Sequence, residues 1–87
     1  MSAGRRLLTL FTSNSCSLCA DAKQALLTVR KQVPFDLKEV DIHTPENRKE
    51  CEKYTFDIPV LHIDHKYAMK HRIDQEKLLN LLRQGSQ

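Results

Sequence analysis

Two cysteines separated by two residues are the side chains of this sequence best suited to chemistry. Cys16 and Cys19 form a Cys-Ser-Leu-Cys motif, and Cys51 is the third cysteine of the chain. A dithiol at this spacing either exchanges disulfides or supplies half of a zinc site. Zinc would need two more ligands, for which the sequence offers only Cys51, His62 and His65. We therefore favour redox exchange and predict no metal site, with metal or iron–sulfur binding through Cys16 kept as an alternative.

The residues around the motif predict a strand, a loop and a helix. The apolar run Arg6–Phe11 suits a buried strand, and small polar residues follow it. Over Ser17–Lys31 apolar residues recur at spacings of three and four, as on one face of a helix. Cys16 is then expected at the helix N-terminus, where unpaired N–H groups and the helix dipole favour a thiolate. Cys16 is the predicted nucleophile, and Cys19, one turn further in, is the predicted resolving thiol.

The remaining sequence predicts one small α/β domain over residues 1–87. Its expected elements are a strand over Phe35–Ile42, a helix over Thr44–Tyr54, a two-stranded hairpin over Phe56–Lys70 and a helix capped by Asp74. The first of these strands has a phase slip at Lys38-Glu39, which implies a bulge or a change of the buried face. The order β-α-β-α-β-β-α predicts a mixed four-stranded sheet flanked by three helices, with a right-handed first crossover.

Two histidines, His62 and His65, lie within the predicted hairpin. His62 and Asp64 alternate with apolar residues, so both are expected on the polar side of a strand. His65 stands at the turn, where histidine tolerates a positive φ angle better than most residues do.

Pro59 is the second residue, after the two cysteines, that indicates a redox site. It follows Ile58 at the start of a strand. A proline there either marks an edge strand, which needs no N–H at that position, or belongs to a cis-proline loop. Together with the dithiol, it predicts a cis-proline loop that faces Cys16. Backbone groups beside such a proline would pair with a substrate as an added strand.

Composition narrows the function classes and the compartment. The chain has 14 basic and 11 acidic residues, scattered along it, and few aromatic residues, which argues against nucleic-acid binding. No apolar run approaches the ~18 residues of a membrane span. Three cysteines do not make the even set of a secreted disulfide scaffold, so we expect a reducing compartment. We also expect a monomer. The cytoplasm is the predicted location, or the mitochondrion if a presequence has been removed.

These features together resemble the glutaredoxin-like proteins of the thioredoxin superfamily. The resemblance spans about residues 6–84 and rests on five segments: Leu10-Phe11-Thr12, Cys16–Cys19, Glu39–Ile42, Asp57–Val60 and Arg72-Ile73-Asp74. It implies a thioredoxin fold and thiol–disulfide oxidoreductase activity on protein or glutathione disulfides. It also implies a Cys16–Cys19 disulfide in the oxidised state, a substrate loop at Ile58 and Pro59, and no tightly bound cofactor.

Several positions differ from the usual glutaredoxin pattern. Serine and leucine replace the proline and tyrosine between the cysteines, and no Gly-Gly precedes the last helix. Ser13 stands where many glutaredoxins place a lysine that aids the thiolate and glutathione, and we predict that Ser13 contacts the substrate. Arg72 or His71, just before the last helix, is predicted to supply the cation instead. Glutathione and a thioredoxin-reductase-type protein are both open as the reductant, and a redox-inactive protein-binding module is the competing interpretation.

Overall fold

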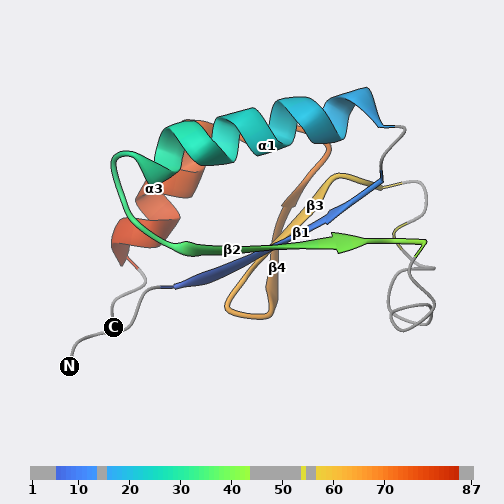
Figure 1. The fold of residues 1–87 in the computed structure, drawn as a ribbon. Helices are drawn as coiled ribbons and strands as arrows, with labels where there is room; N and C mark the ends of the chain where they lie inside the picture. The colour runs from blue at the N-terminus through green and yellow to red at the C-terminus, as the bar shows by residue number, and fades with distance from the viewer. Residues whose placement is uncertain (1–5, 14–15, 44–53, 55–56, 85–87) are drawn as a thin grey trace.

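A computed structural model describes residues 6–13, 16–43, 54 and 57–84 (Figure 1). Its elements are β1 (Leu7–Thr12), α1 (Ser17–Arg30), β2 (Asp36–Asp41), β3 (Val60–Ile63), β4 (Lys66–Lys70) and α3 (Gln75–Gln84). The helix predicted over Thr44–Tyr54 falls outside the described residues except for Tyr54, and so does Cys51. Among the described helices, none has the length and apolar character needed to cross a membrane.

The four strands form one mixed sheet in the order β2-β1-β3-β4. β1 runs parallel to β2 and antiparallel to β3, and β3 runs antiparallel to β4. α1 is the crossover between the parallel strands, and it lies with α3 on one face of the sheet (Figure 1). The mixed four-stranded sheet and the α/β class predicted from the sequence are therefore confirmed.

The main core lies between this face of the sheet and the two helices. Leu26 of α1 and Leu78 of α3 are fully buried in it, and burial of each such side chain stabilises the fold by about 1.5–3 kcal/mol. The buried stripe of α1 has the spacing expected from the sequence, and it consists of Cys19, Ala22, Leu26 and Val29. Because Cys19 is the first member of this stripe, the core itself fixes where the Cys-x-x-Cys motif stands.

The phase slip in β2 is a change of buried face. The pairing of β2 with β1 is regular from Leu7 opposite Asp36 to Thr12 opposite Asp41, so there is no bulge in this ladder. Leu37 packs against the core under α1 and α3. Val40 packs instead with Phe11 on the opposite face of the sheet.

The hairpin confirms one histidine prediction and corrects the other. Asp64 and His65 both have positive φ angles, of 50° and 71°, as expected of a tight turn. His62, however, does not lie on a polar side: all four residues of β3 are buried, and His62 is only 9% exposed. The reason is that β3 is an interior strand of the sheet, and Tyr54 packs over His62 with its hydroxyl 2.9 Å from Nε2.

Candidate redox site

Cys16 occupies the N-cap of α1. Its backbone is extended, with φ −104° and ψ 112°, and its Sγ accepts a hydrogen bond from the Cys19 backbone N–H at 3.1 Å. Serine, threonine, aspartate and asparagine usually make this capping bond through oxygen, and here sulfur takes their place. The Cys19 N–H and the positive end of the helix dipole therefore both face the Cys16 sulfur. The half-buried Cys16 side chain thus stands where the sequence predicted the nucleophile.

Cys19 has different surroundings, although it is only one turn away. Its side chain is 3% exposed and belongs to the apolar stripe of α1. Burial raises the pKa of the Cys19 thiol, and the hydrogen bond with Cys16 raises it further, against smaller lowering effects of Thr12 and Ser13. Cys19 is therefore a protonated, shielded thiol beside an accessible one.

Cys16 and Cys19 are not bonded to each other in this structure. The Cys16–Cys19 disulfide remains a prediction for the oxidised state. The described residues contain no group of three or more histidine, cysteine or carboxylate side chains placed to hold a metal ion.

The end of β1 forms the wall behind the two cysteines. The Ser13 carbonyl accepts a hydrogen bond from the Cys16 N–H at 3.2 Å, and the Ser13 side chain is buried. Ser13 thus shapes the loop, and its predicted contact with substrate remains a prediction. The sequence analysis gave Thr12 no role at the site, although a side-chain hydrogen bond with Thr12 acts to lower the pKa of the Cys19 thiol. The available signal was its alternation with Leu8 and Leu10, which places Thr12 on the face of β1 that α1 covers.

Pro59 lies at the same end of the sheet as the dithiol. The Ile58–Pro59 bond is cis, as predicted. Val60 pairs with Phe11, so Pro59 is beside the end of β1 from which the loop to Cys16 leaves. The backbone groups of this segment are less free than we expected. The Ile58 N–H donates to the Tyr54 carbonyl at 3.2 Å, and the Pro59 carbonyl accepts from the His71 N–H at 2.7 Å. A substrate strand that paired with the Ile58 N–H would have to displace Tyr54.

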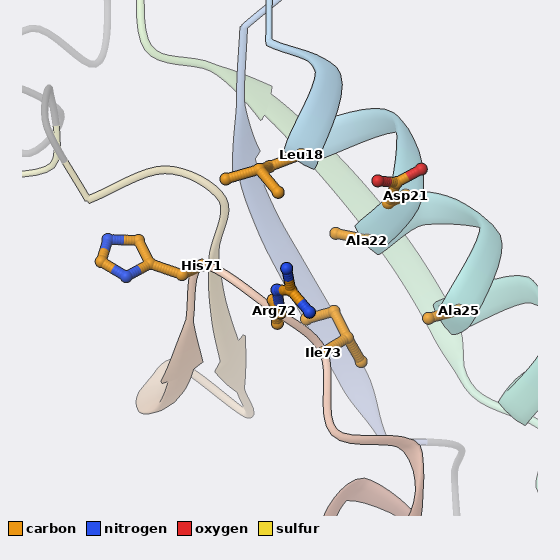
Figure 2. A pocket seen from close by; sticks show the side chains of 7 residues that line it. All are labelled: Leu18, Asp21, Ala22, Ala25, His71, Arg72 and Ile73. Carbon is orange, nitrogen blue, oxygen red and sulfur yellow. The ribbon is translucent and has the colours of Figure 1, made fainter.

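A groove of about 260 Å³ opens beside the first turns of α1 (Figure 2). One wall comes from α1 and the other from the segment between β4 and α3; the lining residues are Leu18, Asp21, Ala22, Ala25, His71, Arg72 and Ile73. Leu18 lies between the two cysteines in the sequence and is 40% exposed. Figure 2 shows Arg72 directed toward the α1 wall and His71 turned away from it. The groove therefore reaches Leu18, the residue before Cys19, and Arg72 is one of its lining residues.

Arg72 and Asp21 are the charged groups of this groove. Neither makes an ion pair with any of the residues that the structure describes. A guanidinium can bind a carboxylate through paired hydrogen bonds, and a carboxylate can accept from an ammonium group. The groove thus offers one site for a negative group and one for a positive group.

The strand order, the crossover helix and a dithiol at the start of that helix define the class of thioredoxin-fold proteins. Within this class the chain belongs to the glutaredoxin-like family, because the model of the glutaredoxin-like domain (DUF836) matches residues 7–83. A curated relative is the glutaredoxin-like protein YDR286C homolog of Dictyostelium discoideum. It is 39% identical over 75 residues, which are 82% of this chain and 69% of that protein.

Solved structures support the same fold. Protein Ne2328 from Nitrosomonas europaea superimposes with a TM-score of 0.78 at 21% identity, over 94% of this chain and 96% of that one. The target protein XcR50 from X. campestris gives a TM-score of 0.70 at 25% identity, over 88% and 96% of the two chains. A mutant thioredoxin from Halobacterium salinarum gives 0.68 at 18% identity, over 97% and 77%.

Proposed function

We propose that this protein is a thiol–disulfide oxidoreductase in which Cys16 is the nucleophile and Cys19 is the resolving thiol. The observation that carries the proposal is the difference between the two sulfurs. Cys16 Sγ caps α1 with a 3.1 Å bond from a backbone N–H and is partly accessible, whereas Cys19 is buried one turn further on. Membership of the glutaredoxin-like family supports a redox role.

In the first step the Cys16 thiolate attacks one sulfur of a substrate disulfide. A new bond joins Cys16 to that sulfur, and the other substrate sulfur leaves as a thiolate and takes up a proton. Cys19 then gives up its proton and attacks Cys16 Sγ, which releases the second substrate thiol. The substrate has gained two electrons, and the protein is left with a Cys16–Cys19 disulfide. Two thiols of an external reductant return it to the dithiol.

Glutathione is the reductant that the groove fits best. It carries carboxylates and an ammonium group, and the groove presents the Arg72 guanidinium and the Asp21 carboxylate beside the first turns of α1. In this proposal Arg72 binds a glutathione carboxylate and so places its sulfur near Cys16. Ile58 and Pro59 form the opposite side of the substrate site, next to the end of β1.

The test is turnover of a small glutathione mixed disulfide with glutathione as the reductant. Wild type is expected to turn over, and Cys16→Ser is expected to lose at least about a hundredfold of the rate, since no other sulfur stands at the N-cap. Arg72→Ala should raise KM for glutathione more than it lowers kcat. Arg83→Ala removes a cation from the exposed side of α3 and is the matched control.

Three results would count against the proposal in different ways. Equal turnover by wild type and Cys16→Ser would remove Cys16 from the mechanism. Turnover with a thioredoxin-reductase-type protein but not with glutathione would keep the chemistry and reject the glutathione groove. Absence of turnover with either reductant, together with retained binding of a protein partner by Cys16→Ser, would favour the redox-inactive binding module.

A further inference from the structure

A second groove, of about 360 Å³, lies at the end of the sheet away from the dithiol. It runs between the edge strand β4 and the helix α3. Its lining residues are Arg6, Ile63, Lys66, Tyr67, Ala68, Lys77, Leu81 and Gln84. Lys66 pairs with Ile63, and Ile63 pairs with Leu8 near the start of β1. Cys16 follows the other end of this six-residue strand, so most of the ~20 Å length of β1 separates the groove from Cys16.

The charges in this groove are of one sign. Arg6, Lys66 and Lys77 line it, and no aspartate or glutamate is among its lining residues. Arg6 is already paired, because its Nε donates to Asp64. Lys66 and Lys77 make no ion pair with any part of the chain that the structure describes. Two lysine charges therefore remain available on the two walls of the groove.

The groove also has an apolar part. Ile63, Ala68 and Leu81 line it, and Ala68 and Leu81 are only partly buried. The ring of Tyr67 does not belong to this part, because it lies 6.4 Å from the His62 ring, on the face of the sheet that carries Phe11.

We propose that the groove between β4 and α3 binds an acidic segment of a partner protein, with one apolar side chain against Ala68 and Leu81 and flanking carboxylates on Lys66 and Lys77. The site is separate from the proposed redox centre and does not depend on its chemistry. The competing explanation is that lysines on an edge strand only prevent association with other strands. That explanation predicts no affinity for acidic peptides.

The test uses a short peptide with glutamates on both sides of one phenylalanine, and a matched peptide in which glutamine replaces every glutamate. Amide chemical shifts of the full-length protein are followed during each titration at about 0.15 M salt. The acidic peptide is expected to shift the amides of Tyr67, Ala68 and Lys77. It should bind at least about tenfold more tightly than the glutamine peptide.

A charge-matched pair of variants completes the test. Lys66→Glu/Lys77→Glu is expected to weaken the acidic peptide at least about tenfold. Lys31→Glu/Lys38→Glu changes the net charge equally at exposed positions outside the groove and should bind as wild type does. Equal weakening in both double variants, equal affinity for the two peptides, or equal competition by anionic vesicles or single-stranded DNA would overturn the proposal. Self-association of Lys66→Glu/Lys77→Glu without any peptide binding by wild type would establish the edge-protecting explanation.

Discussion

Near each end of β1, a side chain accepts a hydrogen bond from a backbone N–H group. After its last residue, Cys16 Sγ accepts from the Cys19 N–H at 3.1 Å, and at its first residue Asp64 Oδ1 accepts from the Leu7 N–H at 3.0 Å. The Asp64 carboxylate also accepts a hydrogen bond from Arg6 Nε, and Asp64 lies in the tight turn between β3 and β4. Cys16 instead borders a groove that begins at Leu18.

The difference lies in what else surrounds the two acceptors. A carboxylate that is already paired with a guanidinium and an N–H has little left to react with, and it ties the β3–β4 turn to the start of β1. A sulfur that receives one N–H at a helix N-terminus stays available to an incoming disulfide. The same kind of hydrogen bond therefore serves structure at one end and, in our proposal, reactivity at the other.

The largest expected effect comes from removing the buried member of the dithiol. In Cys19→Ser, Cys16 can still attack a protein disulfide, but nothing within the Cys-x-x-Cys motif can resolve the product, so a mixed disulfide should accumulate. Non-reducing gel electrophoresis and mass spectrometry of the trapped species measure this. Cys16→Ser is the control and should trap nothing. A complex that formed in Cys16→Ser and not in Cys19→Ser would reverse the two roles.

A smaller but direct comparison is the alkylation rate of the two thiols in the native, reduced protein. We expect iodoacetamide to modify Cys16 at least about tenfold faster than Cys19, because Cys19 is buried and protonated. Peptide mapping after timed quenching separates the two sites. Unfolding in urea should abolish the difference, and an equal ratio in the folded protein would contradict the assigned surroundings.

The raised pKa of Cys19 also predicts a dependence of stability on alkaline pH. The folded protein holds this proton more tightly than the unfolded chain, in which cysteine ionises near ~8.5. Stability should be fully present below that pH and fall as the pH rises through the folded pKa. In urea unfolding, the free energy of unfolding of Cys16→Ser should fall more steeply with rising alkaline pH than that of Cys16→Ser/Cys19→Ala. Parallel pH curves would mean that burial of Cys19 does not hold its proton.

The smallest expected effect is a loss of stability when Asp64, beside the start of β1, is replaced. Burial raises the pKa of Asp64, but the Leu7 N–H and the Arg6 guanidinium together outweigh it and hold the pKa below its usual value. Asp64→Asn should therefore lower stability above the unfolded pKa near ~3.9, by less than about 1 kcal/mol because the pair is exposed.

The loss in Asp64→Asn should shrink as the pH falls through the folded pKa of Asp64 in the wild type, where the wild-type carboxylate is protonated too. Thermal unfolding at neutral and acid pH measures it. Asp21→Asn, which breaks no ion pair among the described residues, is the control. A loss in Asp64→Asn that was the same at every pH would point to packing rather than charge.

Local patterns were enough to predict much of the fold. The spacing of apolar residues in α1, the Asp74 cap of α3 and the turn at His65 depend on neighbours within a few residues, and the structure has each of them. The capping bond is from the Lys77 N–H to Asp74 Oδ1 at 3.0 Å. The prediction from alternation was wrong at His62. Alternation of polar and apolar residues indicates a strand with one solvent-exposed face, and all four residues of β3 are buried.

The sequence by itself determined the class of this protein, since a Cys-x-x-Cys at a strand-to-helix junction and a proline at the head of a later strand are local features. It also determined that Cys16 would stand at the helix N-terminus. Only the tertiary structure decided which groups meet there. It brought Thr12 to Cys19, Arg72 to the groove beside Leu18, and Lys66 and Lys77 to the two walls of one groove. Such contacts join segments far apart in the chain or on different elements, and they depend on strand order and helix packing, which no local pattern specifies.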